Sequence, residues 1–440
     1  MPTSLPPPWQ YRIYRPAMAL VGQLYPAIKR LRQPSPPYPA RYDALRGRWP
    51  ADIRAIGASA TRGTIWVHGV SVGEILATAP FVRLWQSEGP PDVPVIVTTT
   101  TNGGMTLAKK ALPATTPLAF FPFDSPSAIR AAFETFHPAV LVLYETELWP
   151  TLLFEAQRRG IPTLLANARI SDRTANPPAL ARPLIAWMLQ TLTNIIPQSD
   201  LDARRLRTFG VRDDQLLPVG NVKFDAAGEP PTEEARLAAR TALGIGASQP
   251  VFVAGSTHPG EEEMVLDAVT QVRLARKDLL LILAPRHLER LAQVKGILEA
   301  ANMPFRLLSD LQQQGPGLDD PPTIVVDTLG DLMSLYGLAD CAFVGGSLIP
   351  RGGHNILEPA AQGCPVLHGP SMENFRSLVE ILTYAQVAQL VTRESLAHHL
   401  REIVGDAYSR GLWRERALAV VNEGRGTSKR IVEWVKAALE

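Results

Sequence analysis

Short apolar segments alternate with amphipathic segments along the whole chain, and this alternation restricts the fold more than any other feature of the sequence. The first half holds six such segments, at 65–68, 95–99, 118–121, 140–144, 163–167 and 194–197. The second half repeats the rhythm at 251–255, 279–284, 305–308, 323–327, 341–345 and 365–367. Strands that are apolar on both faces are typical of parallel sheets covered by helices. The sequence therefore predicts an α/β fold.

The chain of 440 residues is too long for one hydrophobic core and predicts two domains. A proline-containing, acidic stretch, KFDAAGEPPTEEA (223–235), separates the two series of strands and is typical of a connector. We therefore expect an N-terminal domain over 1–222 and a C-terminal domain over 223–440. The last helix of the chain is a candidate for packing back on the N-terminal domain.

Positive charge gathers at the N-terminus, although the whole chain has a net charge of only +2. Residues 1–62 contain ten Lys or Arg against two Asp, which leaves about +8 there. This basic region suits a membrane surface, a phosphorylated lipid or nucleic acid, or it is simply a solvated face. The apolar stretch 16–28 within it has basic flanks but is too short to span a membrane and lacks a cleavage signature. It predicts either an interfacial helix or a packed N-terminal helix.

Several kinds of chemistry lack their usual signatures. The chain has two cysteines, Cys341 and Cys364, so it has no disulfide framework and no thiolate metal site. The HExxH, Walker and GxGxxG motifs are absent, and the eight histidines do not have metal-ligand spacing. The sequence therefore favours a metal-independent reaction without a resident cofactor.

In the first half, carboxylates follow two of the predicted strands. Glu74 lies at the end of VHGVSVGE (67–74), in the first turn of the next expected helix. It is either a catalytic carboxylate or a helix-end residue stabilised by the helix dipole. Glu145 and Glu147 end the apolar run 140–144 in the sequence ETELWP, where a buried carboxylate needs a partner. Structural and functional interpretations remain equally open for this pair.

In the second half, the polar residues at strand ends are of the kind that binds phosphate. Ser256 and Thr257 precede an expected helix start, and Arg286 with His287 ends another strand. The glycine-rich stretch 345–370 contains Asn355 and Glu358 at capping-box spacing. That spacing predicts a helix over 356–362 whose N-terminus faces a nucleotide phosphate.

Ten motifs, in order along residues 41–376, resemble those of the 3-deoxy-D-manno-octulosonic acid (Kdo) transferases. They are VHGVSVGE (67–74), TTTTNGGMTLAKK (98–110), FPFDSP (121–126), ETELWP (145–150), NARISDR (167–173), GNVKFD (220–225), GSTHPGEEE (255–263), APRH (284–287), DTLGDLMSLYGLADCAFVGGSL (327–348) and GGHNILEPAAQGCPVLHGPSMENF (352–375). The resemblance implies a GT-B fold, in which the parallel sheets of two Rossmann-like domains face a central cleft. It also implies that CMP-Kdo is the donor and that lipid IVA, a tetraacyl-disaccharide 1,4'-bisphosphate, is the acceptor.

The resemblance also assigns roles to individual residues. Glu74 matches the general base that takes the proton from the 6'-hydroxyl of the acceptor, and the transfer inverts the anomeric centre. Glu145 and Lys223 match positions that stabilise the transition state. The segments that match CMP-contacting positions are Arg286-His287, Leu329-Gly330-Asp331 and Asn355-Ile356-Leu357-Glu358, while Ser256 and Thr257 are added as an anion site on their own sequence pattern. The family often has Met-Gly-Glu where this chain has Leu329-Gly330-Asp331, which puts a side-chain role of Asp331 in donor binding in question.

The resemblance places the protein at the cytoplasmic face of the inner membrane, in lipopolysaccharide synthesis, attached peripherally or by its N-terminus. An anionic leaflet and a bisphosphorylated acceptor then account for the basic N-terminus, and no nucleic-acid partner is expected. Two alternatives belong to other classes of protein. One is a different GT-B sugar-nucleotide enzyme, such as a UDP-sugar transferase or epimerase, and the other is a lipid-A-binding protein without catalytic activity.

Overall fold

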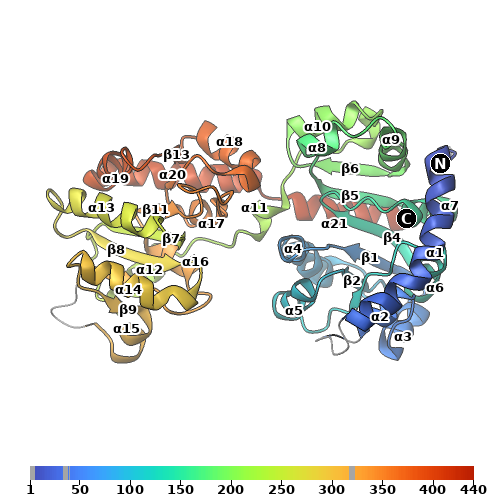
Figure 1. The fold of residues 1–440 in the computed structure, drawn as a ribbon, viewed down its shortest axis with the longest axis horizontal. Coiled ribbons are helices and arrows are strands. Elements are labelled where there is room, and N and C mark those ends of the chain that lie inside the picture. Colours follow the sequence, from blue (N-terminus) through green and yellow to red (C-terminus); the bar gives the residue numbers. More distant parts are fainter. Residues whose placement is uncertain (1–4, 33–37, 39, 317–322) are drawn as a thin grey trace. The chain divides into compact units, whose positions relative to one another are not determined.

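The computed structural model describes residues 5–32, 38, 40–316 and 323–440. The contacts within the chain divide it into two compact units. Unit 1 comprises residues 1–226 and 424–440, and unit 2 comprises residues 227–423. Each unit is an α/β layer structure with helices on both faces of a parallel sheet, as the alternation of apolar segments predicted (Figure 1).

Unit 1 is built on a six-stranded parallel sheet in the order β3-β2-β1-β4-β5-β6. Its strands are β1 (Thr64–His68), β2 (Val95–Thr99), β3 (Leu118–Phe120), β4 (Pro138–Tyr144), β5 (Thr163–Ala168) and β6 (Asn194–Pro197). Its helices are α1 (Trp9–Arg32), α2 (Ala40–Leu45), α3 (Ala51–Ser59), α4 (Val72–Glu88), α5 (Asn102–Ala111), α6 (Pro126–Phe136), α7 (Pro150–Arg159), α8 (Asp172–Ala175), α9 (Arg182–Thr191), α10 (Asp200–Arg207), α11 (Val222–Ala226) and α21 (Thr427–Leu439). All six strands predicted from the first half of the sequence are present.

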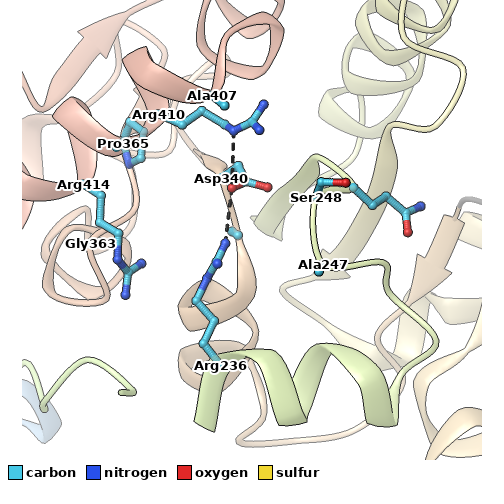
Figure 2. A pocket seen from close by; sticks show the side chains of 12 residues that line it. Arg236, Ala247, Ser248, Asp340, Gly363, Pro365, Ala407, Arg410 and Arg414 are labelled. Atoms are coloured by element: carbon cyan, nitrogen blue, oxygen red, sulfur yellow. Dashed lines mark hydrogen bonds and ion pairs between the residues drawn. The ribbon is translucent and has the colours of Figure 1, made fainter. Parts of the chain in front are cut away.

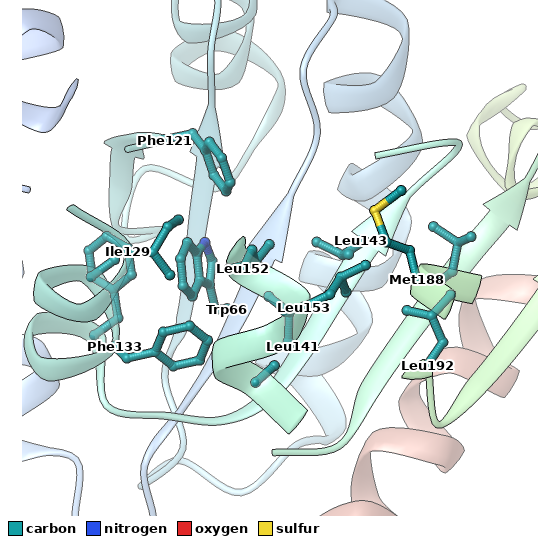
Figure 3. Close-up of a cluster of buried hydrophobic side chains, with 14 of the residues drawn as sticks. Trp66, Phe121, Ile129, Phe133, Leu141, Leu143, Leu152, Leu153, Met188 and Leu192 are labelled. Atoms are coloured by element: carbon teal, nitrogen blue, oxygen red, sulfur yellow. The ribbon is translucent and has the colours of Figure 1, made fainter. Parts of the chain in front are cut away.

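The strands of unit 1 send alternate side chains into two separate cores. In β1, Trp66 points into the first core, whereas Ile65 and Val67 point into the second. Figure 3 shows the first core, where Trp66 packs beside Phe133 of α6 under the helices on that face. This two-sided burial explains why the strands read as continuous apolar runs rather than as alternating ones.

The C-terminal helix α21 belongs to unit 1. Ile431, Val432 and Val435 are buried in the second core together with residues of α4 and β4. Asp225 of α11 caps the start of α21 by accepting hydrogen bonds from the backbone N–H groups of Gly426 and Ser428, each at 2.6 Å. The last helix therefore packs on the N-terminal unit, as the sequence analysis allowed.

Unit 2 is built on a seven-stranded parallel sheet in the order β13-β12-β11-β7-β8-β10-β9. Its strands are β7 (Val251–Thr257), β8 (Leu280–Pro285), β9 (Arg306–Leu307), β10 (Thr323–Val325), β11 (Cys341–Val344), β12 (Val366–His368) and β13 (Ala388–Leu390). Its helices are α12 (Glu233–Ala242), α13 (Glu261–Arg273), α14 (Leu291–Ala300), α15 (Leu308–Gln314), α16 (Leu332–Leu338), α17 (Leu357–Ala361), α18 (Arg376–Tyr384), α19 (Leu396–Gly405) and α20 (Ala407–Gly424). The edge strand β13 was not predicted, because the polar Gln389 interrupts its apolar run and Leu390 is exposed.

The expected connector over 223–235 is shorter in the structure. Residues Val222–Ala226 form helix α11, which packs against α4 and α21, and α12 already begins at Glu233. The contacts therefore place the end of unit 1 at residue 226 rather than at 222. The buried side chains of Val222 and Phe224 hold this segment on unit 1, which the polar composition of the stretch does not reveal.

The N-terminal apolar stretch lies within the 24-residue helix α1. One face of the helix packs on unit 1: Tyr11 contacts Phe154 and Trp187, and the hydroxyl of Tyr14 donates to Asp124 at 2.9 Å. The opposite face exposes Trp9, Ile13, Leu20, Leu24 and Ile28. Among the helices the structure describes, none combines the length and the apolar character that crossing a membrane requires.

Candidate active site

The turn after β1 holds Glu74 in a capping box at the start of α4. The hydroxyl of Ser71 accepts from the Glu74 backbone N–H at 3.3 Å. In return, the Glu74 carboxylate accepts from the backbone N–H groups of Val70 at 2.7 Å and Ser71 at 3.3 Å. Only 7% of Glu74 is exposed. A carboxylate has about four lone-pair positions, so these two hydrogen bonds leave acceptor capacity for a substrate proton.

Glu145 and Glu147 follow β4, in a turn with an unusual backbone. Glu145 has a φ of 61°, in the left-handed region that non-glycine residues rarely occupy. Such conformations persist where the surrounding structure fixes them, and they occur often at functional sites. Glu147 accepts a hydrogen bond from the indole N–H of Trp149 at 2.9 Å and lies 3.9 Å from the ring of the buried His68.

Lys223 is brought to this turn by helix α11. The Lys223 ammonium lies 3.6 Å from a carboxylate oxygen of Glu145. The start of α11 is fixed by Asn167, whose side-chain oxygen accepts from the backbone N–H of Val222 at 3.3 Å. Asn167 also has a left-handed backbone, with a φ of 59°. The three residues predicted for catalysis, Glu74, Glu145 and Lys223, therefore all lie at the carboxyl end of the unit 1 sheet.

We call Glu74, Glu145 and Glu147 the carboxylate cluster. Burial raises the pKa of Glu74, and the charge of Glu145 adds to this shift. Burial, followed by the charge of Glu74, raises the pKa of Glu147 to about 7. His68, in contrast, is fully buried, which lowers its pKa to about 3 and keeps it neutral beside Glu147. Glu74 and Glu147 therefore hold their protons more strongly than ordinary carboxylates do, a property of groups that act as general bases near neutral pH.

The predicted donor-binding residues gather at the carboxyl end of the unit 2 sheet. Ser256 and Thr257 end β7, and Arg286 with His287 directly follows β8. The segment 329–331 follows β10, and the segment 355–358 follows β11. These strands are neighbours in the order β11-β7-β8-β10, so the sheet carries all four segments to one end.

Ser256 and Thr257, in this group, each have an unusual local feature. Ser256 has a left-handed backbone with a φ of 56°. Thr257 is fully buried, and its hydroxyl finds no hydrogen-bond partner among the described residues. A buried hydroxyl without a partner is costly to the fold.

The expected helix over 356–362 is shorter, and its capping box is not formed as predicted. Helix α17 begins at Leu357 and has five residues. The Asn355 side chain accepts from the backbone N–H of Leu357 at 3.1 Å, but its amide donates to Glu358 at 3.1 Å. Glu358 thus binds the Asn355 side chain instead of its backbone N–H. A helix this short contributes little dipole, so phosphate binding here would depend on the loop backbone and on Arg286.

Sequence reasoning missed two groups that shape this end of unit 2. The carboxylate of the fully buried Glu261 accepts from the backbone N–H groups of Gly346, Ser347 and Leu348 at 2.7–3.0 Å and so fixes the loop after β11. The rings of His258 and His354 lie parallel, with their Nε2 atoms 2.9 Å apart. Their positions in GSTHPGEEE and GGHNILE gave no metal or catalytic spacing, so only the fold brings them together.

The described residues contain one group whose side chains could together hold a metal ion, His398, His399 and Glu402. It lies on the surface of α19 and includes no member of the carboxylate cluster or of the predicted donor-binding segments.

Comparison with known proteins decides the family. The model of the 3-deoxy-D-manno-octulosonic-acid transferase (kdotransferase) family matches residues 44–226. The chain is 32% identical to the 3-deoxy-D-manno-octulosonic acid transferase of Haemophilus influenzae, over 86% of this chain and 87% of that protein. The chain belongs to the Kdo transferase family. It is also 32% identical to the Bordetella pertussis transferase of the same description, over 77% of this chain and 76% of that protein.

Solved structures agree with the fold of a GT-B protein. A UDP-GlcNAc 2-epimerase from Neisseria meningitidis, bound to UDP-GlcNAc, aligns over 85% of this chain and all of its own chain, with a TM-score of 0.58 and 14% identity. A putative UDP-N-acetylglucosamine 2-epimerase from Listeria monocytogenes gives a TM-score of 0.58 over 86% of this chain and 96% of its own, with 15% identity. At 14–15% identity, the likeness to these two structures supports the fold alone.

The pairing of His258 with His354 leads to a prediction of how mild acid changes the stability of this Kdo transferase. Burial, with Arg286 and His258 nearby, lowers the pKa of His354 to about 4. A histidine in the unfolded chain titrates near 6.5, so His354 binds a proton less readily in the native state than in the unfolded state. The stability from this effect is complete above pH 6.5 and is lost as the pH falls toward 4. We expect His354→Gln to reduce the loss of unfolding free energy between pH 7 and 5 by about 1–2 kcal/mol.

Urea unfolding followed by circular dichroism at several pH values measures this difference. His398→Gln, which removes an exposed histidine of unit 2, serves as the control and should behave as the wild type does. An equal loss of stability in wild type and His354→Gln would contradict the assignment.

Proposed function

We propose that this protein transfers Kdo from CMP-Kdo to the 6'-hydroxyl of lipid IVA in lipopolysaccharide synthesis, with inversion at the anomeric carbon. Glu74 takes the proton from the acceptor hydroxyl, and the hydroxyl oxygen then forms a bond to the anomeric carbon of Kdo. The bond between that carbon and the phosphate oxygen breaks, and CMP leaves with the electron pair. Because CMP is a good leaving group, one general base is sufficient and no metal ion is required.

The position of Glu74 is the single observation that carries this proposal. Its carboxylate is 7% exposed, has a raised pKa and keeps unused acceptor positions at the carboxyl end of the unit 1 sheet. A carboxylate that served only to cap α4 would need neither burial nor two carboxylate neighbours, because capping requires only the two backbone hydrogen bonds.

Lys223 and Glu145 form an ion pair close enough to the proposed base for the charge of Glu145 to act on it. The Lys223 ammonium beside Glu145 provides a positive charge for the negative charge that develops on the phosphate as CMP departs. In this assignment Glu145 positions Lys223, and the left-handed backbone of Glu145 holds its carboxylate in place. Lys223 is therefore proposed to stabilise the transition state, and Glu145 to orient it.

The donor is proposed to bind at the carboxyl end of the unit 2 sheet. Arg286 is exposed there, and its charge acts on both His354 and Glu358. Glu358 is then placed to accept hydrogen bonds from ribose hydroxyls, in addition to its bond with Asn355. Leu329 is exposed and Gly330 has a φ of 99°. This segment is therefore proposed to contact the donor through its backbone, with no role for the Asp331 side chain.

Replacing Glu74 by Gln separates catalysis from capping. Glutamine satisfies a capping box as glutamate does, so the fold should be retained. It cannot accept the hydroxyl proton, so we expect Kdo transfer to fall by about 10²–10⁴-fold. The measurement is mass spectrometry of lipid IVA after incubation with CMP-Kdo in the presence of EDTA.

Glu88→Gln is the matched control, because Glu88 is the exposed last residue of the same helix. Equal transfer by wild type and Glu74→Gln would make Glu74 a helix-end residue only. If the wild type left CMP-Kdo unchanged but consumed a UDP-sugar, the substrate assignment would be wrong.

Attachment to the inner membrane at its cytoplasmic face is proposed to occur through α1, as a peripheral helix. The exposed apolar residues of α1 lie on one face at helical spacing, with exposures of 48–61%: Trp9, Ile13, Leu20, Leu24 and Ile28. Arg12 and Arg15 are exposed in the same helix and suit anionic headgroups. The other face of α1 is occupied by contacts with unit 1, so the helix is held in a fixed orientation.

A double substitution on the exposed face of α1 tests this attachment. We expect Leu20→Glu with Leu24→Glu to abolish most co-sedimentation with anionic vesicles, because two charges replace apolar contacts. Kdo transfer to detergent-dispersed acceptor should persist. Leu274→Glu, at an exposed leucine of unit 2, is the control. Undiminished vesicle binding by the double variant would show that α1 is not the attachment site.

A further inference from the structure

Unit 2 contains a cavity of about 200 Å³ that is lined by arginines and is separate from the proposed donor site. We call it the arginine pocket and define it by Arg236 of α12, Asp340, and Arg410 and Arg414 of α20 (Figure 2). Backbone and small side chains complete its wall, including Ser248, Gly363, Pro365, Ala407 and Gly411.

The arginine pocket lies at the amino end of the sheet. Gln249, Asp340 and Pro365 line it, and they stand just before the first residues of β7, β11 and β12. The proposed donor-binding segments follow the other ends of β7 and β11. Strands of four to seven residues at 3.3 Å per residue separate the two sites by roughly 13–23 Å. The arginine pocket is therefore not an extension of the donor site.

Positive charge exceeds negative charge among the shielded groups of the pocket. Arg236, Arg240 and Arg410 are only 12%, 1% and 14% exposed at their side chains, and all three surround Asp340, which is 13% exposed. Arg414 adds a fourth, half-buried arginine. The remaining nearby carboxylates, Glu233, Asp278 and Asp406, are exposed at the rim. Shielded charges need partners, so this arrangement favours a bound anion.

The protein uses only part of the hydrogen-bonding capacity of the pocket. Arg414 forms one hydrogen bond within the described chain, to the carbonyl of Gln362 at 3.0 Å. Arg410 donates to the carbonyl of Val404 at 2.6 Å, and Arg236 donates to Glu233 and Asp340. Each guanidinium carries five N–H groups, so most of the donors remain for a ligand. In addition, the buried Nε of Arg236 has no partner among the described residues.

Crowding of like charges is evident in two of these arginines. Burial, and then the neighbouring Arg236, lowers the pKa of Arg414. Burial also lowers the pKa of Arg240, where Asp340 opposes the shift and Arg236 and Arg410 add to it. An anion in the pocket would relieve both effects, since it would stabilise the charged forms.

We propose that the arginine pocket binds a phosphate dianion, either free or as a phosphate monoester. Guanidinium groups bind phosphate oxygens in pairs of parallel hydrogen bonds, and here they come from two helices, with Arg236 on α12 and Arg410 and Arg414 on α20. Two negative charges would offset the excess of positive charge left after Asp340. A bound phosphate would tie α12 and α20 to the amino end of the sheet and so stabilise unit 2.

Gly363 gives Arg414 the room that this site requires. Its φ is 74°, and a side chain at this position would begin 2.8 Å from Cγ of Arg414. A larger residue there would be strained by its backbone and would displace the arginine. The glycine and the arginine therefore act as one structural feature of the pocket.

Thermal unfolding with increasing sodium phosphate, against sodium chloride at equal ionic strength, tests this site. The wild type should show a saturable rise in Tm. Arg414→Gln should need at least tenfold more phosphate for the same rise, because it loses a charged, paired contact. Arg416→Gln is the matched control: Arg416 lies on the same helix, bonds Gln386 and does not line the pocket. Arg286→Gln, in the proposed donor site, should keep the phosphate effect.

The outcomes distinguish phosphate binding in the arginine pocket from a general effect of anions on stability. An equal phosphate effect in wild type and Arg414→Gln would overturn the proposal, as would its loss in Arg286→Gln. Arg414→Lys, which keeps the charge without the paired geometry, replaces Arg414→Gln if the latter does not fold, and a weakened effect is again expected. None of these readouts depends on Kdo transfer, so the proposed activity can fail without affecting this result.

Vesicles of phosphatidylcholine, with or without phosphatidic acid, distinguish the source of the phosphate. If binding to phosphatidic acid is lost in Arg414→Gln and is competed by free phosphate, the ligand is a lipid headgroup. If free phosphate alone stabilises the wild type, the ligand is soluble. Either result supports the site, and no response in either arm contradicts it.

Discussion

Parallel pairing of every strand is the constraint on which both units depend. In a parallel sheet all carboxyl ends lie at one end, so residues far apart in the sequence meet there without any direct pairing between them. In unit 1 this brings the turns after β1 and β4 together, and with them Glu74, Glu145 and Glu147. In unit 2 it brings together the segments that follow β7, β8, β10 and β11. The two cores of each sheet hold the strands in register and so hold these turns in position.

The energetic cost of the carboxylate cluster explains several local features of unit 1. Three carboxylates near one another repel, and burial disfavours the ionised forms of Glu74 and Glu147. Lys223 offsets part of this repulsion through Glu145, and the capping box offsets another part through two backbone N–H groups on Glu74. The left-handed backbone at Glu145 is one more local cost that the surrounding fold must support. The proposed function would account for this cost, since the fold alone does not require three charged residues here.

Much of this structure could be predicted from the sequence, and the exceptions have physical reasons. The apolar runs located twelve of the thirteen strands, because a strand buried on both faces must be apolar throughout. The missed strand β13 is an edge strand whose middle residue is the polar Gln389, so it is not apolar throughout. The boundary at residue 226 depends on the packing of Phe224 and Val222, which no composition reveals. The capping interaction of Asn355 differed because its backbone N–H and side-chain amide compete for Glu358, and spacing alone does not decide between them.

The candidate site divides in the same way. The positions of Glu74 and Glu145 at strand ends followed from the pattern, whereas their possible roles came from resemblance to the family. The pairing of His258 with His354 and the three arginines around Asp340 were not foreseen, because each set joins residues that are far apart in the sequence. Only the sheet order brings these residues together.

The pH dependence of kcat/KM for Kdo transfer tests most directly whether the carboxylate cluster sets the protonation of the base. Glu74 must be ionised to act, so activity should fall as the pH drops through the raised pKa of Glu74. The charge of Glu145 contributes to the raised pKa of Glu74, so Glu145→Gln should lower that pKa and move the acid limb to lower pH. Glutamine keeps the length of the replaced side chain and removes only its charge. An acid limb that stays in place or moves to higher pH would contradict the account.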